Sequence, residues 1–489
     1  AAMPQRARHP WSRLALLAFA SSHSCRRCAA SGSGSGHSGD AWQSRCKPAL
    51  MAGMPPHYVA YKVRDADMSI DGQLSEPAWA AAPAVEDFGS IYGPEFEARH
   101  PEERPWHGTS AKVLWSDDYV YVGGHLGESQ LWAVDKGWTL PTEQVSPERP
   151  RFDCTESWIP SCPYRSADFE FFFSPGLHGT AEWYKEFEFN ANVEQRWNLG
   201  RGPSVMTLAL PRPYNDLHGQ VPLWLNPSVC AELRGCEYRV TADGRLNDPA
   251  WAAKHPNSSW TLEVKIPVRY LLANATGAQH PADGVQWRLA FSRVEYRLRA
   301  NASAPGGYEK VFATALERRQ GHFDRNWVWP PTFMYDVHMP DLWSVLQFSE
   351  LPPGAAPAAF EEEKVNWPAY GTLSRLYYAQ WDRHFVAGNF SADVSELRRA
   401  YEVLADPGAV DSFKEERQIL SFPPVPAAAW EPDCADIHVE RDAETGWRAS
   451  VRTPEFPEQR WTMDGWRRVR VESLPREGAG LFAQDADLV

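Results

Sequence analysis

Two segments of the chain place acidic and amide side chains where they can do chemistry together. In residues 168–173 three alternate phenylalanines share one face of an extended strand, so Glu170 points to the other face. In residues 184–190 two phenylalanines point inward in the same way, so Glu188 and Asn190 point outward together. Carboxylates and amides hydrogen-bond to hydroxyl groups, and two carboxyls about 5 Å or about 6.5–9.5 Å apart can hydrolyse a glycosidic bond. A solvated sheet face explains the same pattern equally well.

These segments need neighbouring strands to hold them side by side, and the sequence supplies several. Apolar residues alternate again in residues 262–266 and 287–291, and residues 110–122 fit a hairpin that turns at a pair of aspartates. Many short alternating strands without regular helices between them favour an antiparallel β-sandwich. We therefore predict a mainly β protein in which residues 57–350 form one sandwich.

The character of the sequence changes after residue 350. A linker rich in proline and alanine precedes two stretches with apolar residues at helical spacing, residues 373–381 and 394–404. Ser391 is the expected cap of the second helix, and two short strands are expected near the end of the chain. Residues 351–489 are therefore predicted to form a smaller helical and α+β C-terminal region whose role is packing.

The first residues resemble a targeting segment. Three arginines precede the apolar run at residues 14–20, which ends in a small-x-small sequence typical of a cleavage site. Residues 31–39 are a linker rich in glycine and serine. We expect residues 1–56 to be leader and linker outside the fold, and the mature protein to be secreted. A plastid-type leader is the alternative.

Cysteines and glycosylation sequons also favour an oxidising, extracellular location. Two close cysteine pairs lie in loops that contain proline or glycine, and each pair is expected to form a disulfide clip, Cys154 with Cys162 and Cys230 with Cys236. A zinc site is less favoured, because the spacings are too wide and no histidine lies between the cysteines. The four Asn-x-Ser/Thr sequons, which are the expected glycosylation sites, are Asn257, Asn274, Asn301 and Asn389.

Length and charge limit the classes of partner. The chain has 489 residues, enough for two or three domains. Its 63 acidic and 49 basic side chains give a net charge of −14, which argues against nucleic acid because phosphates need a basic face. No run of about 18 apolar residues exists, so no membrane-spanning helix is expected.

A turn motif stands near the start of the predicted sandwich. Residues 70–79 contain an Asp-Gly pair typical of tight turns, because glycine enters the left-handed region freely. Ser75 is the expected cap of a short helical turn, on which Trp79 can plug one end of the core. Residues 243–253 repeat the motif closely. The strand after them, residues 260–267, fits the interior of a single module better than the start of a second one.

Together these segments resemble the carbohydrate-binding modules of family 9. The opening turn motif, the hairpin, the acidic strand and a Trp-x-x-Glu-x-x-Ile-Pro strand each have a counterpart in that module. Later segments are similar to a larger group of family-9-like bacterial proteins. The segments that carry the resemblance are residues 70–79, 111–122, 168–173, 260–267, 326–330, 338–343 and 376–380.

The resemblance implies a sugar ring clamped between two aromatic planes, with polar side chains that read its hydroxyls. Glu188 stands where the family has arginine, and the second aromatic plane falls near His338, where Trp329, Tyr335 or Trp343 is the candidate to supply it. The strand residues are expected to face a shared, solvent-reachable surface with the first aromatic near its rim. The residues implied to contact sugar are Tyr164, Glu170, Glu188, Asn190, Trp329 and His338.

The function implied is non-catalytic binding of mono- or oligosaccharides or of polysaccharide ends, in support of polysaccharide breakdown. A glycoside hydrolase or its accessory chain is the first alternative, although Glu170 and Glu188 would share one face without an evident cleft. A haem-binding β-sandwich is less favoured, because His338 and Met339 are adjacent and point to opposite faces of a strand. The resemblance implies calcium as a structural ion, with ligands that the sequence does not assign. No other cofactor is expected.

Overall fold

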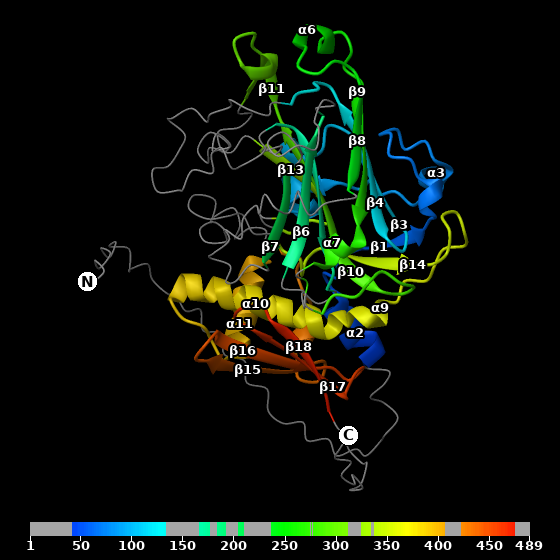
Figure 1. Cartoon of the computed structure of the whole chain (residues 1–489). Helices are drawn as coiled ribbons and strands as arrows, with labels where there is room; N and C mark the ends of the chain where they lie inside the picture. The colour runs from blue at the N-terminus through cyan, green and yellow to red at the C-terminus, as the bar shows by residue number, and fades with distance from the viewer. Residues whose placement is uncertain are drawn as a thin grey trace, which may run out of the picture.

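The computed structural model describes residues 42–133, 166–176, 183–191, 204–209, 236–273, 275, 277–311, 324–333, 337–405 and 422–474. They form a large β-structure, a long helix that crosses beneath it, and a small antiparallel sheet on the far side of that helix (Figure 1). The protein is therefore mainly β with a helical and α+β C-terminal region, as predicted.

The large sheet contains twelve strands among the residues described. They are β1 (His57–Lys62), β2 (Gly89–Ser90), β3 (Thr109–Trp115), β4 (Tyr119–Glu128), β5 (Asp168–Ser174), β6 (Trp183–Asn190), β7 (Ser204–Ala209), β8 (Glu237–Asp243), β9 (Ser258–Pro267), β10 (Gln286–Tyr296), β13 (Asp324–Trp329) and β14 (Ser344–Ser349). Their order is β7-β6-β5-β10-β14-β1-β3-β4-β9-β8, with β13 beside β10 and β2 beside β13. Strand β1 pairs in parallel with β14 and β3, whereas the other described pairs in this sheet are antiparallel.

The sheet folds over on itself, so that its two halves enclose one core. Gly124 of β4 lies against Phe169 of β5, although four strands separate β4 from β5 in the sheet order. A Cβ atom at position 124 would stand 3.2 Å from the Phe169 ring, so glycine is what allows this close approach. Alternate phenylalanines of β5 and β6 share the core with valines of β3, β4 and β9. This arrangement is the predicted β-sandwich.

The opening turn motif packs on the outer face of β1, β3 and β4, so Trp79 does not plug the end of the sandwich core as predicted. Gly72 adopts a φ of +84°, which favours glycine. Trp79 lies on α3 (Pro77–Ala81), is 1% exposed, and packs with Tyr61 and Leu114. The expected capping role of Ser75 is not found, because the helix begins after Glu76 and has no side-chain cap.

The second copy of the motif reproduces the turn but not the buried tryptophan. Its helical turn is α6 (Pro249–Ala252), in which the Asp248 carboxylate accepts a hydrogen bond of 2.9 Å from the Trp251 N–H. The Trp251 ring is only half-buried and stacks on His255, with 4.1 Å between ring centroids. Strands β8 and β9 flank this turn and belong to the same sheet as β1 to β7. The repeat is therefore local, and one sandwich contains both copies.

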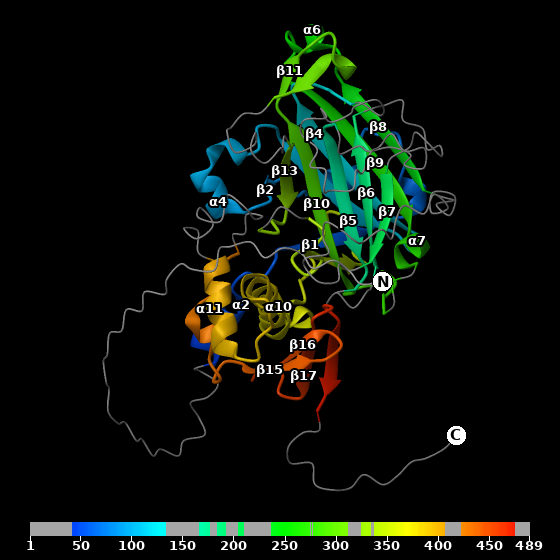
Figure 2. The same cartoon turned by 90° about the vertical axis from the view of Figure 1, so that its left-hand side faces the viewer.

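The C-terminal region consists of two helices and a four-stranded antiparallel sheet. Its main elements are α10 (Trp367–Ala387), α11 (Val394–Leu404), β15 (Asp436–Asp442), β16 (Gly446–Arg452), β17 (Gln459–Asp464) and β18 (Val469–Ser473). Viewed along α10, helix α11 lies on one side and the small sheet lies below (Figure 2). The cap of α11 is Asp393 rather than Ser391, and the Ser391 hydroxyl instead donates a 2.6 Å hydrogen bond to Glu396.

Shorter elements complete the described structure. They are a π-helical turn (Trp42–Cys46), α2 (Lys47–Met51), α4 (Pro94–Arg99), α7 (Val268–Leu272), α9 (Glu362–Val365), 3-10 turns at Asp65–Asp67, Pro101–Glu103, Pro305–Gly307 and Ala427–Trp430, and the two-stranded ribbon of β11 (Leu298–Ala300) and β12 (Tyr308–Lys310).

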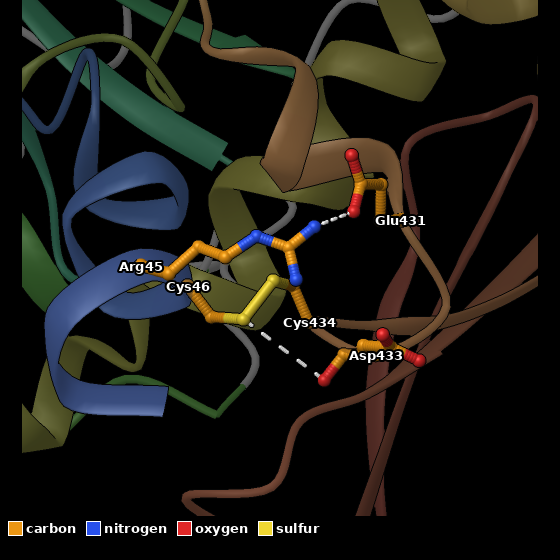
Figure 3. Close-up of a disulfide and its surroundings, with 5 residues drawn as sticks. All are labelled: Arg45, Cys46, Glu431, Asp433 and Cys434. Atoms are coloured by element: carbon orange, nitrogen blue, oxygen red, sulfur yellow. Dashed lines mark hydrogen bonds and ion pairs between the residues drawn. A yellow bond between two sulfur atoms is a disulfide. The ribbon is translucent and has the colours of Figure 1, made fainter. Parts of the chain in front are cut away.

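The segment before β1 is part of the C-terminal region. Cys46 forms a disulfide with Cys434, 388 residues later, and Arg45 forms an ion pair with Glu431 beside it (Figure 3). Leu50 of α2 is fully buried in the core that α10 and α11 share. Residues 42–56 therefore lie inside the fold, which differs from the prediction that residues 1–56 are leader and linker. The composition of residues 42–56, next to a flexible linker, gives no sign that Cys46 pairs with a cysteine so distant in the sequence.

A buried polar network joins the C-terminal region to the sandwich. Asp341, just before β14, accepts a 2.7 Å hydrogen bond from the Tyr378 hydroxyl of α10. Its other carboxylate oxygen lies 3.2 Å from the guanidinium of Arg467, between β17 and β18. All three side chains are almost fully buried. The sandwich and the C-terminal region are thus joined by buried side-chain contacts and not by a solvated linker alone.

The other expected features fall partly outside the described residues. Cys154, Cys162 and Cys230 lie outside them, so their pairing, including that of Cys236, stays a prediction. Asn274 also lies outside, whereas Asn257 and Asn389 are exposed, and the Asn301 amide donates a hydrogen bond to Glu309. No helix in the described parts is long and apolar enough to cross a membrane.

Candidate functional site

The outer face of β5, β6 and β10 carries a compact group of polar side chains. Glu170 lies directly opposite Glu188 in the β5–β6 ladder, and Asp168 lies opposite Asn190. On the other side of β5, Ser292 of β10 lies opposite Glu170. Directly paired residues point to the same face of a sheet. The alternation of the sequence thus brings together the predicted residues Glu170, Glu188 and Asn190 and adds two that were not predicted.

Three carboxylates of this group converge. Asp168, Glu170 and Glu188 each present one oxygen atom within 4.8 Å of the others. Their side chains are nevertheless buried, with residue exposures of 1%, 5% and 2%. We call these three residues the acidic trio. Asn190 beside them is 1% exposed and donates a 3.2 Å hydrogen bond to the Ser166 hydroxyl.

The burial corrects the expectation of a solvent-reachable surface. Farther along the same face, the rings of Phe172 and Tyr184 lie 5.3 Å and 5.1 Å from the ring of Trp343. Val337 and Ile91 belong to the same apolar cluster. Segments that precede and follow β13 in the sequence therefore pack against this face. Alternation shows which residues share a face, but it does not show what packs over them.

The electrostatics of the acidic trio are unusual. Burial raises the pKa of the Asp168 carboxyl well above its usual value, and Glu170 and Glu188 raise it further. Burial likewise raises the pKa of Glu188, and the carboxylates of Glu186 and Glu170 add to the rise. Like charges in a buried site favour the neutral form in this way. In the described structure no lysine or arginine forms an ion pair with Asp168 or Glu188.

Several polar atoms at the site lack partners. The N–H of Val294 lowers the pKa of Asp168 in part, yet neither carboxylate oxygen of Asp168 accepts a hydrogen bond of normal geometry. One oxygen of Glu188 and the hydroxyl of Ser292 are also buried without a hydrogen bond. Buried polar atoms without partners are unfavourable, so these atoms are candidates to hydrogen-bond to a ligand.

His338 lies at the solvent edge of this face. Its Nε2 atom is 3.3 Å from a carboxylate oxygen of Glu186, and its ring lies 6.0 Å from that of Phe172 and 6.3 Å from that of Tyr184. The His338 side chain is 38% exposed, whereas that of Glu186 is 3% exposed. The structure therefore brings His338 to the predicted site, where it lies between the buried carboxylates and solvent.

Of the remaining predicted residues, Trp329 is not brought to this face. Trp329 lies in the core of the sandwich, where its ring packs 6.3 Å from that of Phe291. In β13 the alternation turns Val328, rather than Trp329, toward the outer face. Tyr164 lies outside the described residues. Asp168 and Ser292, which were missed, follow the same period-two pattern as Glu170 and could have been found from it.

A second buried acidic group lies elsewhere in the sandwich. Glu128 of β4 and Glu295 of β10 lie 3.5 Å and 3.7 Å from His107. Here a positively charged side chain is present, because the Arg293 guanidinium lies 2.5 Å from a carboxylate oxygen of Glu295 and 3.3 Å from one of Glu128. Burial alone would raise the pKa of Glu295, but Arg293 and His107 outweigh it and lower the pKa to about 2. This group is an ion-pair network around Arg293, in which burial and the neighbouring Glu295 raise the pKa of Glu128 well above its usual value.

Comparison with known proteins gives only distant similarities. No protein-family model and no curated protein matches the chain. Three solved structures resemble it over 60–62% of its length and 98–99% of theirs. One, from Bacteroides uniformis, is described as a candidate carbohydrate-binding protein (14% identity, TM-score 0.34). Two are of a family 9 carbohydrate-binding module from Caldicellulosiruptor kristjanssonii, one with cellotriose (11%, 0.31) and one with glucose (12%, 0.31).

Proposed function

We propose that the chain is a non-catalytic carbohydrate-binding protein that reads sugar hydroxyls with the outer face of β5, β6 and β10. The observation that carries the proposal is the register of the two acidic strands. Glu170, Glu188 and Asn190 are the residues that the family 9 resemblance assigns to hydroxyl recognition, and they lie side by side.

The chemistry of the face fits a ligand rich in hydroxyl groups. Carboxylate oxygens accept hydrogen bonds, and a sugar hydroxyl can donate one while it accepts another. The oxygens of Asp168 and one oxygen of Glu188 have acceptor capacity that the protein does not use. His338, at the exposed edge, is where a ligand would enter. Because a polar site discriminates by leaving groups unpaired when a hydroxyl is missing, specificity would follow hydroxyl geometry.

Titration calorimetry of the full chain tests this function, after a screen of immobilised glycans has chosen the ligand. Asn190→Ala should weaken binding roughly 2- to 12-fold, because one hydrogen bond contributes about 0.5–1.5 kcal/mol. Glu440→Gln, at an exposed position of β15, is the control and should bind as the wild type does. If no saccharide binds at about millimolar concentration, the function is wrong. If binding survives both Asn190→Ala and Glu170→Gln, the face is wrong.

Hydrolysis of glycosides is the second candidate. It is favoured by the closeness of Glu170 and Glu188, each of which places a carboxylate oxygen within 4.8 Å of the other's, and by the raised pKa of Glu188, which suits a general acid. Against it, the two residues are direct neighbours on one face, so they would approach a sugar from the same side. Release of aryl alcohol from aryl glycosides, abolished by Glu188→Gln, would establish it over binding alone.

The haem alternative finds no support in the described residues. His338 faces Phe172 and Tyr184, whereas Met339 is fully buried in the core of the C-terminal region. The two side chains therefore point away from any common iron. An absorption spectrum of the purified protein without a Soret band would agree with this arrangement.

We further propose that the protein works outside the cell, in support of polysaccharide breakdown. The Cys46–Cys434 disulfide supports an oxidising compartment, because such bonds persist there and are rare in the cytosol. The exposed sequons at Asn257 and Asn389 are accessible to glycosylation. Mass spectrometry of the protein from its native source would detect glycans at these asparagines, and their absence together with reduced cysteines would contradict the location.

A further inference from the structure

Strand β18 is an open edge of the small C-terminal sheet. The sheet order is β15-β16-β17-β18, so β18 pairs with β17 on one side and with no described strand on the other. In Figure 2 it is the red strand of that sheet. Its first residue, Val469, is buried, whereas residues 470–473 are all exposed. An edge of this kind presents unpaired N–H and C=O groups, and these are a template for another strand.

The backbone register shows which groups of β18 point to the open side. The N–H of Leu474, just after the strand, donates a 2.6 Å hydrogen bond to the carbonyl of Glu458, on the side of β17. In an antiparallel ladder, successive residues direct their N–H and C=O groups alternately to the two sides of the strand. The even-numbered residues of β18 therefore bond toward β17. The odd-numbered residues, centred on Val471, offer their groups to the open side.

The side chains of this edge are complementary to a second copy of themselves. Val471 is 45% exposed, more than any other large apolar residue in the described parts of the chain. Arg470 and Glu472 flank it and point to one face of the sheet, because they are two residues apart. If a second β18 lies antiparallel with Val471 opposite Val471, each Arg470 lies opposite the partner's Glu472. Opposite charges in such pairs stabilise a ladder, and like charges destabilise it.

Neighbouring registers do not offer this match. A pair of β18 strands centred on Arg470 would place two arginines opposite each other, and one centred on Glu472 would do the same with two glutamates. Like charges directly opposite each other are unfavourable. The charges of β18 therefore select the register that is centred on Val471.

The other edge of the same sheet provides a contrast. Among the described strands, β15 pairs only with β16. An antiparallel pair of β15 strands centred on the middle residue, Val439, would place Asp436 of each copy opposite the partner's Asp442. Charges on an edge strand commonly prevent pairing with another copy in this way. The charges of β18 have the opposite effect.

We propose that β18 is the interface of a two-fold dimer, in which two copies of the chain pair their β18 edges antiparallel about Val471. A two-fold axis uses the same surface on both copies, which is the commonest symmetry of soluble oligomers. Backbone hydrogen bonds complete the open edge, the two Val471 side chains lie side by side, and two pairs of Arg470 with Glu472 set the register. One short strand is a small contact, so the dimer is weak and forms as the protein concentration rises. The proposal is independent of the carbohydrate function, because β18 is not part of the face assigned to sugar.

Sedimentation equilibrium of the full chain without sugar tests the dimer. The apparent mass should rise from that of one chain at about 1 µM toward twice that value at about 0.5 mM. A mass that stays at one chain over this whole range would overturn the proposal.

Two charge variants test the interface. Arg470→Glu makes the edge acidic and Glu472→Arg makes it basic, so each variant alone should self-associate at least about tenfold more weakly. An equimolar mixture of the two should dimerise again, because the acidic edge of one meets the basic edge of the other. Arg441→Glu is the matched control, since it makes the same charge change at an exposed position of β15, and it should dimerise as the wild type does.

The double variant Arg470→Glu/Glu472→Arg guards against single variants that do not fold. It exchanges the two charges and keeps every opposite pair, so it should dimerise as the wild type does. Unchanged self-association in both single variants would place any dimer interface elsewhere and overturn the proposal. A mixture of folded single variants that stays monomeric would overturn it as well.

Discussion

One buried carboxylate, that of Glu263 in β9, organises the opening turn of the sandwich. Its oxygens accept hydrogen bonds of 2.8 Å from the Trp79 indole and of 2.9 Å and 3.0 Å from the N–H groups of Asp71 and Gly72. Burial raises the pKa of Glu263, while the hydrogen bonds from Trp79 and Gly72 oppose the rise. Glu263 therefore joins the turn motif to β9. Both segments are among those that carry the family 9 resemblance.

Replacing Trp79 should therefore be costly. Trp79→Ala removes a fully buried ring and leaves Glu263 without its indole donor, so we expect a loss of about 3–5 kcal/mol in the free energy of unfolding. Trp251→Ala, at the corresponding position of the half-buried second copy, should lose less than about 1 kcal/mol. Urea denaturation measures both. Equal losses in the two variants would mean that the burial of Trp79 contributes no more stability than the half-buried Trp251.

The ion-pair network around Arg293 should make stability sensitive to acid. A carboxyl whose pKa is lowered by folding contributes stability that is present above its unfolded pKa of about 4.3 and is lost as the pH falls toward its folded pKa. For Glu295, with a pKa of about 2, the loss should reach about 2 kcal/mol between pH 5 and pH 2.5.

A pair of variants isolates this effect. Glu128→Gln leaves Glu295 as the titrating carboxyl beside Arg293, and the double variant Glu128→Gln/Glu295→Gln removes it. Denaturation at the two pH values should show a smaller drop in the double variant than in the single one. Parallel drops in the two proteins would contradict the lowered pKa.

At the level of residues, the sequence predicted which side chains share a face and not how deeply they lie. Period-two alternation placed Glu170, Glu188 and Asn190 together, and the same rule applies to Asp168. Farther along the same face, Phe172 and Tyr184 are covered by Trp343, which lies more than 150 residues later in the chain. No local pattern records such a contact.

At the level of elements, strands were easier to predict than their partners. The hairpin of β3 and β4 followed from its turn residues, because the two strands are adjacent in sequence. The helical segment at residues 42–51 was missed, since its packing depends on α10 and on a disulfide to Cys434. A short helix of this kind has no stability of its own to signal it.

The Cys46–Cys434 disulfide should secure that helical segment. Cys46→Ser should lower the free energy of unfolding by about 2–4 kcal/mol, because the bond restricts a long loop in the unfolded chain. Thermal unfolding under oxidising conditions measures the loss. Cys434→Ser should have the same effect, and the double variant should lose nothing further. Additive losses in the double variant would show that the two cysteines act separately.

At the level of the whole molecule, the first and last strands of the sandwich are neighbours. β1 pairs in parallel with β14, so that residues 57–62 meet residues 344–349. The composition change after residue 350 predicted where the sandwich ends, but alternation does not specify which strands pair or in which direction. The C-terminal region then packs against the sandwich through Asp341, Tyr378 and Arg467, and this contact has no signature in the sequence.

The central claim is that the outer face of β5, β6 and β10 binds carbohydrate, and a crystal structure of the full chain with the best ligand from the glycan screen tests it most directly. The account predicts a sugar ring over this face, near His338, with hydroxyls within hydrogen-bonding distance of Glu170 or Asn190. A sugar bound on another face, or a face that stays empty at saturating ligand concentration, would contradict it.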